Sequence, residues 1–148
     1  MGVRAAIDAL VGVVTAADPV RVQGVRFAEM PERSRSAPSS RSRLFDLTVT
    51  GSGDGEGTGF RARRRHLVDL SIYYAAGFGG IGQESVTIAE DVAVLTVALG
   101  ASNVGTLAGV AVVHPPDAHE VEPVVPEGKD SPTGLVVTVP FIIETRES

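Results

Sequence analysis

The hydrophobic positions along this chain change period several times, and each change predicts a different element. From Phe60 to Ala75 apolar and polar side chains alternate, so that Val68, Leu70 and Ile72 share one face. A period of two is typical of a strand that buries one face. We therefore expect a long central strand in this stretch.

Four shorter segments also predict strands, at residues 20–27, 44–50, 110–113 and 135–145. In the last of them Pro140 interrupts the alternation. Proline has no N–H to donate to a neighbouring strand, so we expect this strand to lie at an edge or to bulge there.

Helical spacing predicts two helices, at residues 3–16 and 87–99. In the second, Thr87 and Glu90 have the spacing of a capping box. Its inward stripe is expected to consist of Ile88, Val92, Leu95 and Leu99. Val94 and Val97 are apolar outside that stripe, which is typical of a helix that is covered on two sides.

Three segments lack any periodicity and predict long, mobile loops, at residues 29–43, 51–59 and 115–134. They are rich in serine, glycine or proline. The pattern as a whole predicts one α+β domain over residues 1–148, in which a mainly antiparallel or mixed β-sheet packs against two helices.

Composition narrows the classes of protein that fit this pattern. The chain has 148 residues and no cysteine, which excludes disulfides and thiolate metal sites. No apolar run reaches the roughly 20 residues of a membrane helix, and the first residues do not resemble a secretory signal. We expect a protein that is made in the cytoplasm and has no membrane partner.

Charge is divided unevenly along the chain. Residues 1–65 carry eleven arginines against seven acids, and residues 66–148 carry two bases against eleven acids. Two solvated faces are the simpler interpretation. The alternative is a molecule whose oppositely charged patches meet in neighbouring copies. Arginine also suits interface ion pairs. The candidate interface residues are Arg41, Arg43, Arg63, Arg64, Arg65, Val94 and Val97.

Motifs that carry chemistry are weak. Gly77, Gly79 and Gly82 fit the letters of a dinucleotide-binding fingerprint, but a helix start at Thr87 is too late, and no acid follows at the distance that a ribose needs. A metal cluster around His114 lacks a second group of ligands, and His66 has no orienting partner on its own face. We predict no catalytic, cofactor-binding or metal-binding residue.

The order of elements resembles the tail terminator (tail completion) proteins of tailed bacteriophages, the group of lambda minor tail protein U. The resemblance rests on an N-terminal amphipathic helix, an arginine-bearing loop, the strand HLVDLSIYY, the helix IAEDVAVLTVAL and the last strand VVTVPFIIE. It covers nearly the whole chain, through patterns rather than invariant signatures.

This resemblance implies a structural, non-enzymatic virion protein at the head-proximal end of the tail. Six copies would form a ring that caps the tail tube, stops its polymerisation and binds the neck or head-completion protein, with genome DNA passing through the lumen. No cofactor is implied. The alternatives are another neck or tube component, such as a head-closure or tail-tube protein, and a small nucleotide-binding enzyme.

Overall fold

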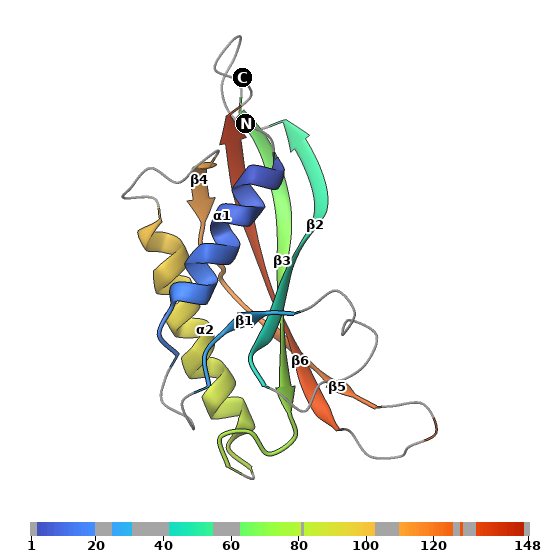
Figure 1. Ribbon diagram of the computed structural model, residues 1–148. Coiled ribbons are helices and arrows are strands. Elements are labelled where there is room, and N and C mark those ends of the chain that lie inside the picture. The colour runs from blue at the N-terminus through green and yellow to red at the C-terminus, as the bar shows by residue number, and fades with distance from the viewer. Residues whose placement is uncertain are drawn as a thin grey trace.

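The fold is built on a mixed six-stranded sheet with two helices on one face (Figure 1). The computed structural model describes residues 3–19, 25–30, 42–54, 63–80, 82–102, 110–125, 128 and 133–146. The helices are α1 (Val3–Ala16) and α2 (Glu84–Ala101). The strands are β1 (Ala28–Glu29), β2 (Leu44–Asp54), β3 (Arg63–Ala75), β4 (Val110–His114), β5 (Glu120–Val124) and β6 (Gly134–Arg146). The expected α+β class is confirmed.

Strands β3 and β6 form the centre of the sheet. The order is β1-β2-β3-β6-β4, and β5 also pairs with β6. All pairs are antiparallel except the short parallel pair of β1 with β2. The last strand, β6, therefore pairs with three other strands, β3, β4 and β5.

Pro140 lies where the outer side of β6 has no described partner strand. β5 pairs with residues 134–138 of β6 and β4 pairs with residues 142–145, so the two strands leave a gap between them. A residue without an N–H is tolerated there, because the outer side of the strand has no described partner to accept a bond. The expectation of a local edge at Pro140 is confirmed.

The hydrophobic core lies between the helices and one face of the sheet. Val68, Leu70 and Ile72 are buried, which confirms the alternation read from β3. In α2 the predicted stripe is also buried, with Leu95 fully inaccessible. Each such side chain contributes roughly 1.5–3 kcal/mol through its burial. In α1 the buried positions are Ala6, Leu10 and Val14.

The opposite face of the sheet is open around its middle. Leu67 is 48% exposed and Pro140 is exposed, although both belong to central strands. No described helix lies on this face (Figure 1). A central strand with an exposed leucine leaves apolar surface available to a partner.

All three predicted loops contain strand residues and need correction. Glu29 belongs to β1, and β5 lies inside the segment 115–134. β2 continues to Asp54, because a register shift between Val49 and Gly51 lets glycine-rich residues stay paired with β3. A bulge of this kind interrupts the period of two, which hid the continuation. Residues 31–41 and 55–62, and most of the expected strand 20–27, lie outside the described residues.

The second helix begins earlier than predicted, at Glu84 instead of Thr87. Gln83 is the N-cap residue and makes no side-chain capping bond. The hydroxyl of Thr87 donates to the carbonyl oxygen of Gln83 at 3.2 Å, so Thr87 is an interior residue of the first turns. The predicted capping box of Thr87 and Glu90 is therefore wrong.

Candidate functional site

Arg43 and Asp91 form an ion pair inside the molecule. Arg43 Nε lies 2.8 Å from Asp91 Oδ2, and Arg43 Nη2 lies 2.8 Å from Asp91 Oδ1. The two side chains are 1% and 0% exposed. This two-bonded geometry is the strongest that an arginine makes with a carboxylate, and the pair ties the start of β2 to the middle of α2.

Other polar and aromatic groups complete the surroundings of this pair. Tyr74 donates its hydroxyl to Asp91 Oδ2 at 2.7 Å, and Arg43 Nη1 donates to the carbonyl oxygen of Val25 at 2.8 Å. The guanidinium carbon lies 5.7 Å from the ring centre of Phe27 and 5.0 Å from that of Phe78. No buried side-chain nitrogen or oxygen of the described residues lacks a hydrogen-bond partner.

The environment also affects the ionisation of Tyr74. Burial raises the pKa of its phenol well above the ordinary value, and the negative charge of Asp91 raises that pKa further. The hydroxyl therefore stays protonated and remains a donor to the carboxylate. These contacts stabilise the fold, and both members of the ion pair are almost fully buried.

Arg43 is thus not an interface residue, and its place in the predicted set is corrected. Its side chain is saturated by partners of its own chain. It also has φ of 65°, which is unusual for a residue other than glycine and aims the side chain inward from the start of β2. Arg41 lies outside the described residues.

The other candidate arginines lie at the start of β3 and point to both faces of the sheet. Arg64 and Arg65 are exposed, and Arg63 is half-buried. Arg64 shares the parity of buried His66, so it lies on the helix side, while Arg63 and Arg65 lie on the open side. Arg4, which is also exposed, lies near the same end of the molecule at the start of α1 (Figure 1).

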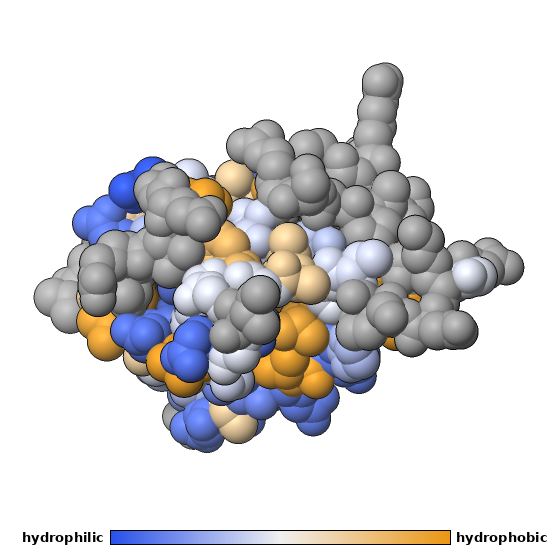
Figure 2. All heavy atoms as spheres, turned by 90° about the horizontal axis from the view of Figure 1, so that it is seen from below, coloured by the Kyte–Doolittle hydropathy of each residue, from blue (hydrophilic) through white to orange (hydrophobic). Residues whose placement is uncertain are grey.

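The apolar candidates on α2 differ from each other. Val97 is 72% exposed, whereas Val94 is half-buried and packs against the core. Exposed apolar side chains are spread over several elements, and at the lower end of the molecule hydrophobic and hydrophilic residues are interspersed (Figure 2). The exposed large hydrophobic residues among those described are Val49, Leu67, Val86, Val97, Val121 and Val125.

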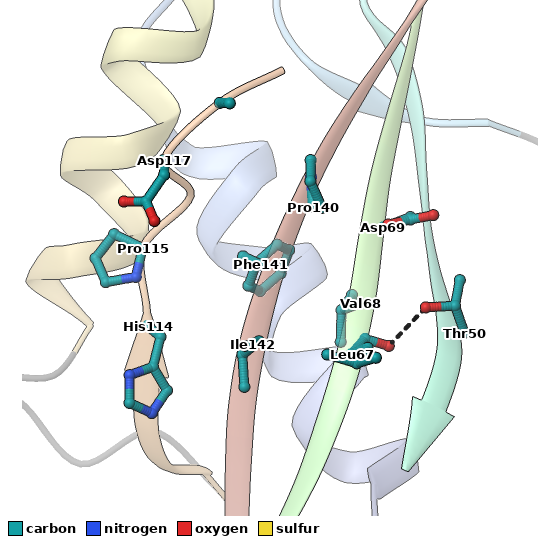
Figure 3. A pocket seen from close by; sticks show the side chains of 11 residues that line it. Thr50, Leu67, Val68, Asp69, His114, Pro115, Asp117, Pro140, Phe141 and Ile142 are labelled. Atoms are coloured by element: carbon teal, nitrogen blue, oxygen red, sulfur yellow. Dashed lines mark hydrogen bonds between the residues drawn. The ribbon is translucent and has the colours of Figure 1, made fainter. Parts of the chain in front are cut away.

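A groove of about 380 Å³ opens beside the gap between β4 and β5. In Figure 3 the helices lie behind the sheet, so the groove belongs to the open face. Its floor is formed by β3 and β6, and one wall by the segment that follows β4. The described lining residues are Thr50, Leu67, Val68, Asp69, His114, Pro115, Asp117, Ala118, Pro140, Phe141 and Ile142.

The groove combines an apolar floor with two carboxylates. Asp69 is half-buried and Asp117 is exposed, and neither carboxylate has an ion-pair or hydrogen-bond partner in the described part of the chain. His114 Nε2 lies 2.9 Å from Glu144 Oε2, so the imidazole is already engaged. No lysine or arginine is among the described lining residues. This arrangement suits a cation that carries an apolar stem.

The glycine-rich loop is closed on itself. Gly77, Gly79 and Gly82 have positive φ, and the backbone N–H of Gly82 donates to Glu84 Oε1 at 3.3 Å. A carboxylate therefore occupies the position beside the helix N-terminus where a phosphate would bind. Helix α2 begins two residues after Gly82, so a late start of the helix no longer argues against nucleotide binding. The position of the Glu84 carboxylate still argues against it.

His66, which the sequence left without an orienting partner, has two hydrogen-bond partners in the structure. His66 Nδ1 lies 2.7 Å from Ser52 Oγ, and its Nε2 lies 3.0 Å from Thr145 Oγ1. His66 is buried, and Asp69 lies on the opposite face of β3. The described residues contain no group of three or more side chains that could hold a metal ion.

Comparison with known proteins adds no relative. No protein-family model matches the chain, and no curated protein matches it significantly. No helix among the described residues is long and apolar enough to span a membrane. The candidate features of the described surface are the open sheet face with its groove, the outer side of α2, and the arginines at the start of β3.

Proposed function

We propose that this protein is a structural component of a phage-like tail, which assembles into a ring, caps the tail tube and joins it to the neck of the head. The ring would consist of about six copies, as the resembled family implies, and would lie at the head-proximal end of the virion tail. The protein acts through contacts with itself, with the tube protein and with a neck protein, and genome DNA passes through the lumen.

The observation that carries this proposal is the difference between the two sides of the molecule. The open sheet face offers a groove with two carboxylates, Asp69 and Asp117. The helix side offers exposed Val97 and exposed Arg64. Contacts between two unlike surfaces are head-to-tail, and they generate a ring when the rotation between neighbours closes.

Charge supports the same arrangement. Unlike patches on neighbouring copies attract each other, while like patches repel, so the charges select one orientation of docking. The basic residues lie at one end of β3, whereas Glu120 and Glu122 lie on β5, which pairs with the opposite half of β6. The arginines at the start of β3 and the glutamates of β5 thus lie toward opposite ends of the sheet.

The proposal is tested with the purified protein and isolated tail tubes. We expect a ring-shaped density at one end of each tube in electron micrographs, and tubes that stop growing when the protein is present during polymerisation. A tail-tube protein would instead polymerise into long tubes by itself. Absence of any binding to tube ends would contradict the proposal.

Two positions on α2 offer a matched pair of variants. Val97→Asp places a charge on the outer side of the helix, where the side chain is 72% exposed, and should leave the subunit folded but weaken ring formation. Leu95→Asp buries an unpaired carboxylate at a fully buried position and should prevent folding. If the Val97→Asp protein forms normal caps on tail tubes, the outer side of α2 does not belong to the interface between subunits.

A further inference from the structure

We propose that the groove on the open sheet face receives the side chain of Arg64 from a second copy of this chain. The inference rests on the proposed ring, and it names the residue and the receptor through which neighbouring subunits recognise each other. It follows from the shape and charge of the groove and from the side of the sheet on which Arg64 lies.

The groove suits both parts of an arginine side chain, the apolar stem and the charged guanidinium. Leu67 and Ile142 offer apolar surface to the three methylene groups of the side chain. Asp69 lies on β3, in the floor, and Asp117 lies in the wall after β4, on the other side of β6 (Figure 3). A guanidinium presents donors in several directions within one plane, and so can bond to either carboxylate.

The groove also lacks an internal source of positive charge. No described lining residue is a lysine or arginine, and His114 is held by Glu144 at 2.9 Å. A cation supplied from outside therefore meets carboxylates that have no counter-charge among the described lining residues.

Arg64 is the residue whose position matches a head-to-tail contact. It is exposed and lies on the helix side of β3, opposite the groove. One subunit cannot place this residue in its own groove across the sheet. A neighbour that packs its helix side against the open face brings Arg64 toward the groove, and the same contact repeats around a ring.

The neighbouring arginine provides a matched control. Arg65 has the same charge and is also exposed, but it points to the open face like the groove itself. Replacement of either residue by lysine keeps the charge and adds a primary amine. The natural chain contains a single lysine, Lys129, so an added amine is easily assigned.

The experiment uses the full-length Arg64→Lys and Arg65→Lys proteins with a water-soluble carbodiimide. The reagent activates a carboxylate, the amine attacks the acyl carbon, and the reagent leaves as a urea, so an amide joins two groups that were in contact. Equal amounts of nitrogen-15-labelled and unlabelled protein are mixed, and crosslinked peptides are identified by mass spectrometry. A link between one labelled and one unlabelled peptide proves contact between copies.

We expect mixed-label links from residue 64 to Asp69 or Asp117 in the Arg64→Lys protein, and none to those carboxylates from residue 65 in the Arg65→Lys protein. In parallel, Asp69→Asn with Asp117→Asn should weaken self-association of the wild-type chain about tenfold or more. Glu90→Gln, which removes one exposed charge from α2, should leave association unchanged.

The outcomes separate this inference from the proposed function. Capped tubes without links from residue 64 to the groove would overturn the inference and leave the tail terminator intact. Mixed-label links in a protein that ignores tube ends would support the inference and overturn the terminator. If neither the links from residue 64 nor capped tubes are found, the inference and the proposed function are both overturned.

Discussion

At the scale of single residues, the pairing of Arg43 with Asp91 could not be predicted from the sequence. The two residues lie 48 positions apart, and nothing in the local pattern connects them. One signal was present: Asp91 follows Ile88 by three positions and precedes Leu95 by four, so it belongs to the inward stripe of α2. A charge on an apolar stripe requires a buried partner, but the sequence does not say which of twelve arginines supplies it.

Removal of one member of this pair should be severe. Asp91→Ala leaves the guanidinium of Arg43 buried without its counter-charge, so the free energy of unfolding should fall by about 3–5 kcal/mol. Urea denaturation followed by circular dichroism measures the change. The paired replacement Arg43→Met with Asp91→Leu is the control, and it should cost clearly less because no charge is left behind. A loss below about 1 kcal/mol for Asp91→Ala would contradict the structure.

The phenol of Tyr74 predicts a loss of stability at alkaline pH. Burial and Asp91 raise the pKa of Tyr74 in the folded state, while an unfolded tyrosine ionises near pH ~10. The contribution of the buried Tyr74 phenol to the free energy of unfolding is therefore complete below pH ~10. Above it only the unfolded state loses the proton, so stability falls by roughly 1.4 kcal/mol for each pH unit.

Denaturation series between pH 8 and 12 test this slope. Tyr73 contributes in the same direction, because burial raises its pKa as well. Tyr74→Phe should lower stability below pH ~10, through loss of the bond to Asp91, and should also reduce the alkaline slope, so that its difference from the wild type shrinks as pH rises. An unchanged slope in that variant would show that Tyr74 ionises equally in both states.

At the scale of elements, long periodic segments were predictable and their ends were not. The alternation in β3 and the stripe of α2 each repeat often enough to fix type and buried face. β5 was missed because Glu120, Val121, Glu122 and Pro123 are all exposed, so burial imposes no alternation on it. Its strand conformation comes from pairing with β6, which is a property of the sheet and not of the segment.

The loop before α2 predicts a sharp difference between two glycines. A Cβ atom at Gly79 would lie 2.1 Å from Thr87 Oγ1, whereas one at Gly82 would meet nothing within 4 Å. Both residues have positive φ, so Gly82→Ala should cost about 1–2 kcal/mol from backbone strain alone. Gly79→Ala should cost more, because Thr87 or the loop has to move.

Thermal unfolding of the two variants gives the comparison. The additional change Thr87→Ala removes the hydroxyl that stands nearest to the new Cβ atom. It should therefore recover part of the loss in Gly79→Ala and none of the loss in Gly82→Ala. Equal melting temperatures for the two glycine variants would mean that the loop packs differently from the structure.

At the scale of the whole molecule, the sequence predicted that charge is divided but not where the divided charges meet. The groove depends on residues of β2, β3, β6 and the segment after β4, which only the sheet order brings together. Of the predicted interface arginines, Arg43 is buried, whereas Arg63, Arg64 and Arg65 lie at the start of β3. Their role in assembly remains a prediction.

Charge reversal at Arg63 and Arg65 tests that role. These residues lie on the open side of β3, so the double change to glutamate should shift the melting temperature by only about 2 °C. Docking on tail tubes should weaken, and wild-type docking should weaken as salt is raised. Electron microscopy then shows overlong tubes without caps. Tails of normal length with normal caps would reject the prediction.

The central place of β6 has a consequence for how the protein is made. Until residue 146 has been synthesised, β3 has no partner on one side, and β4 and β5 have nothing to pair with. A nascent chain therefore exposes the unpaired edge of β3, together with its apolar face, the situation in which chaperones are needed. Folding on the ribosome therefore cannot complete the sheet before β6 has emerged, so a subunit becomes competent to assemble only once its last strand is in place.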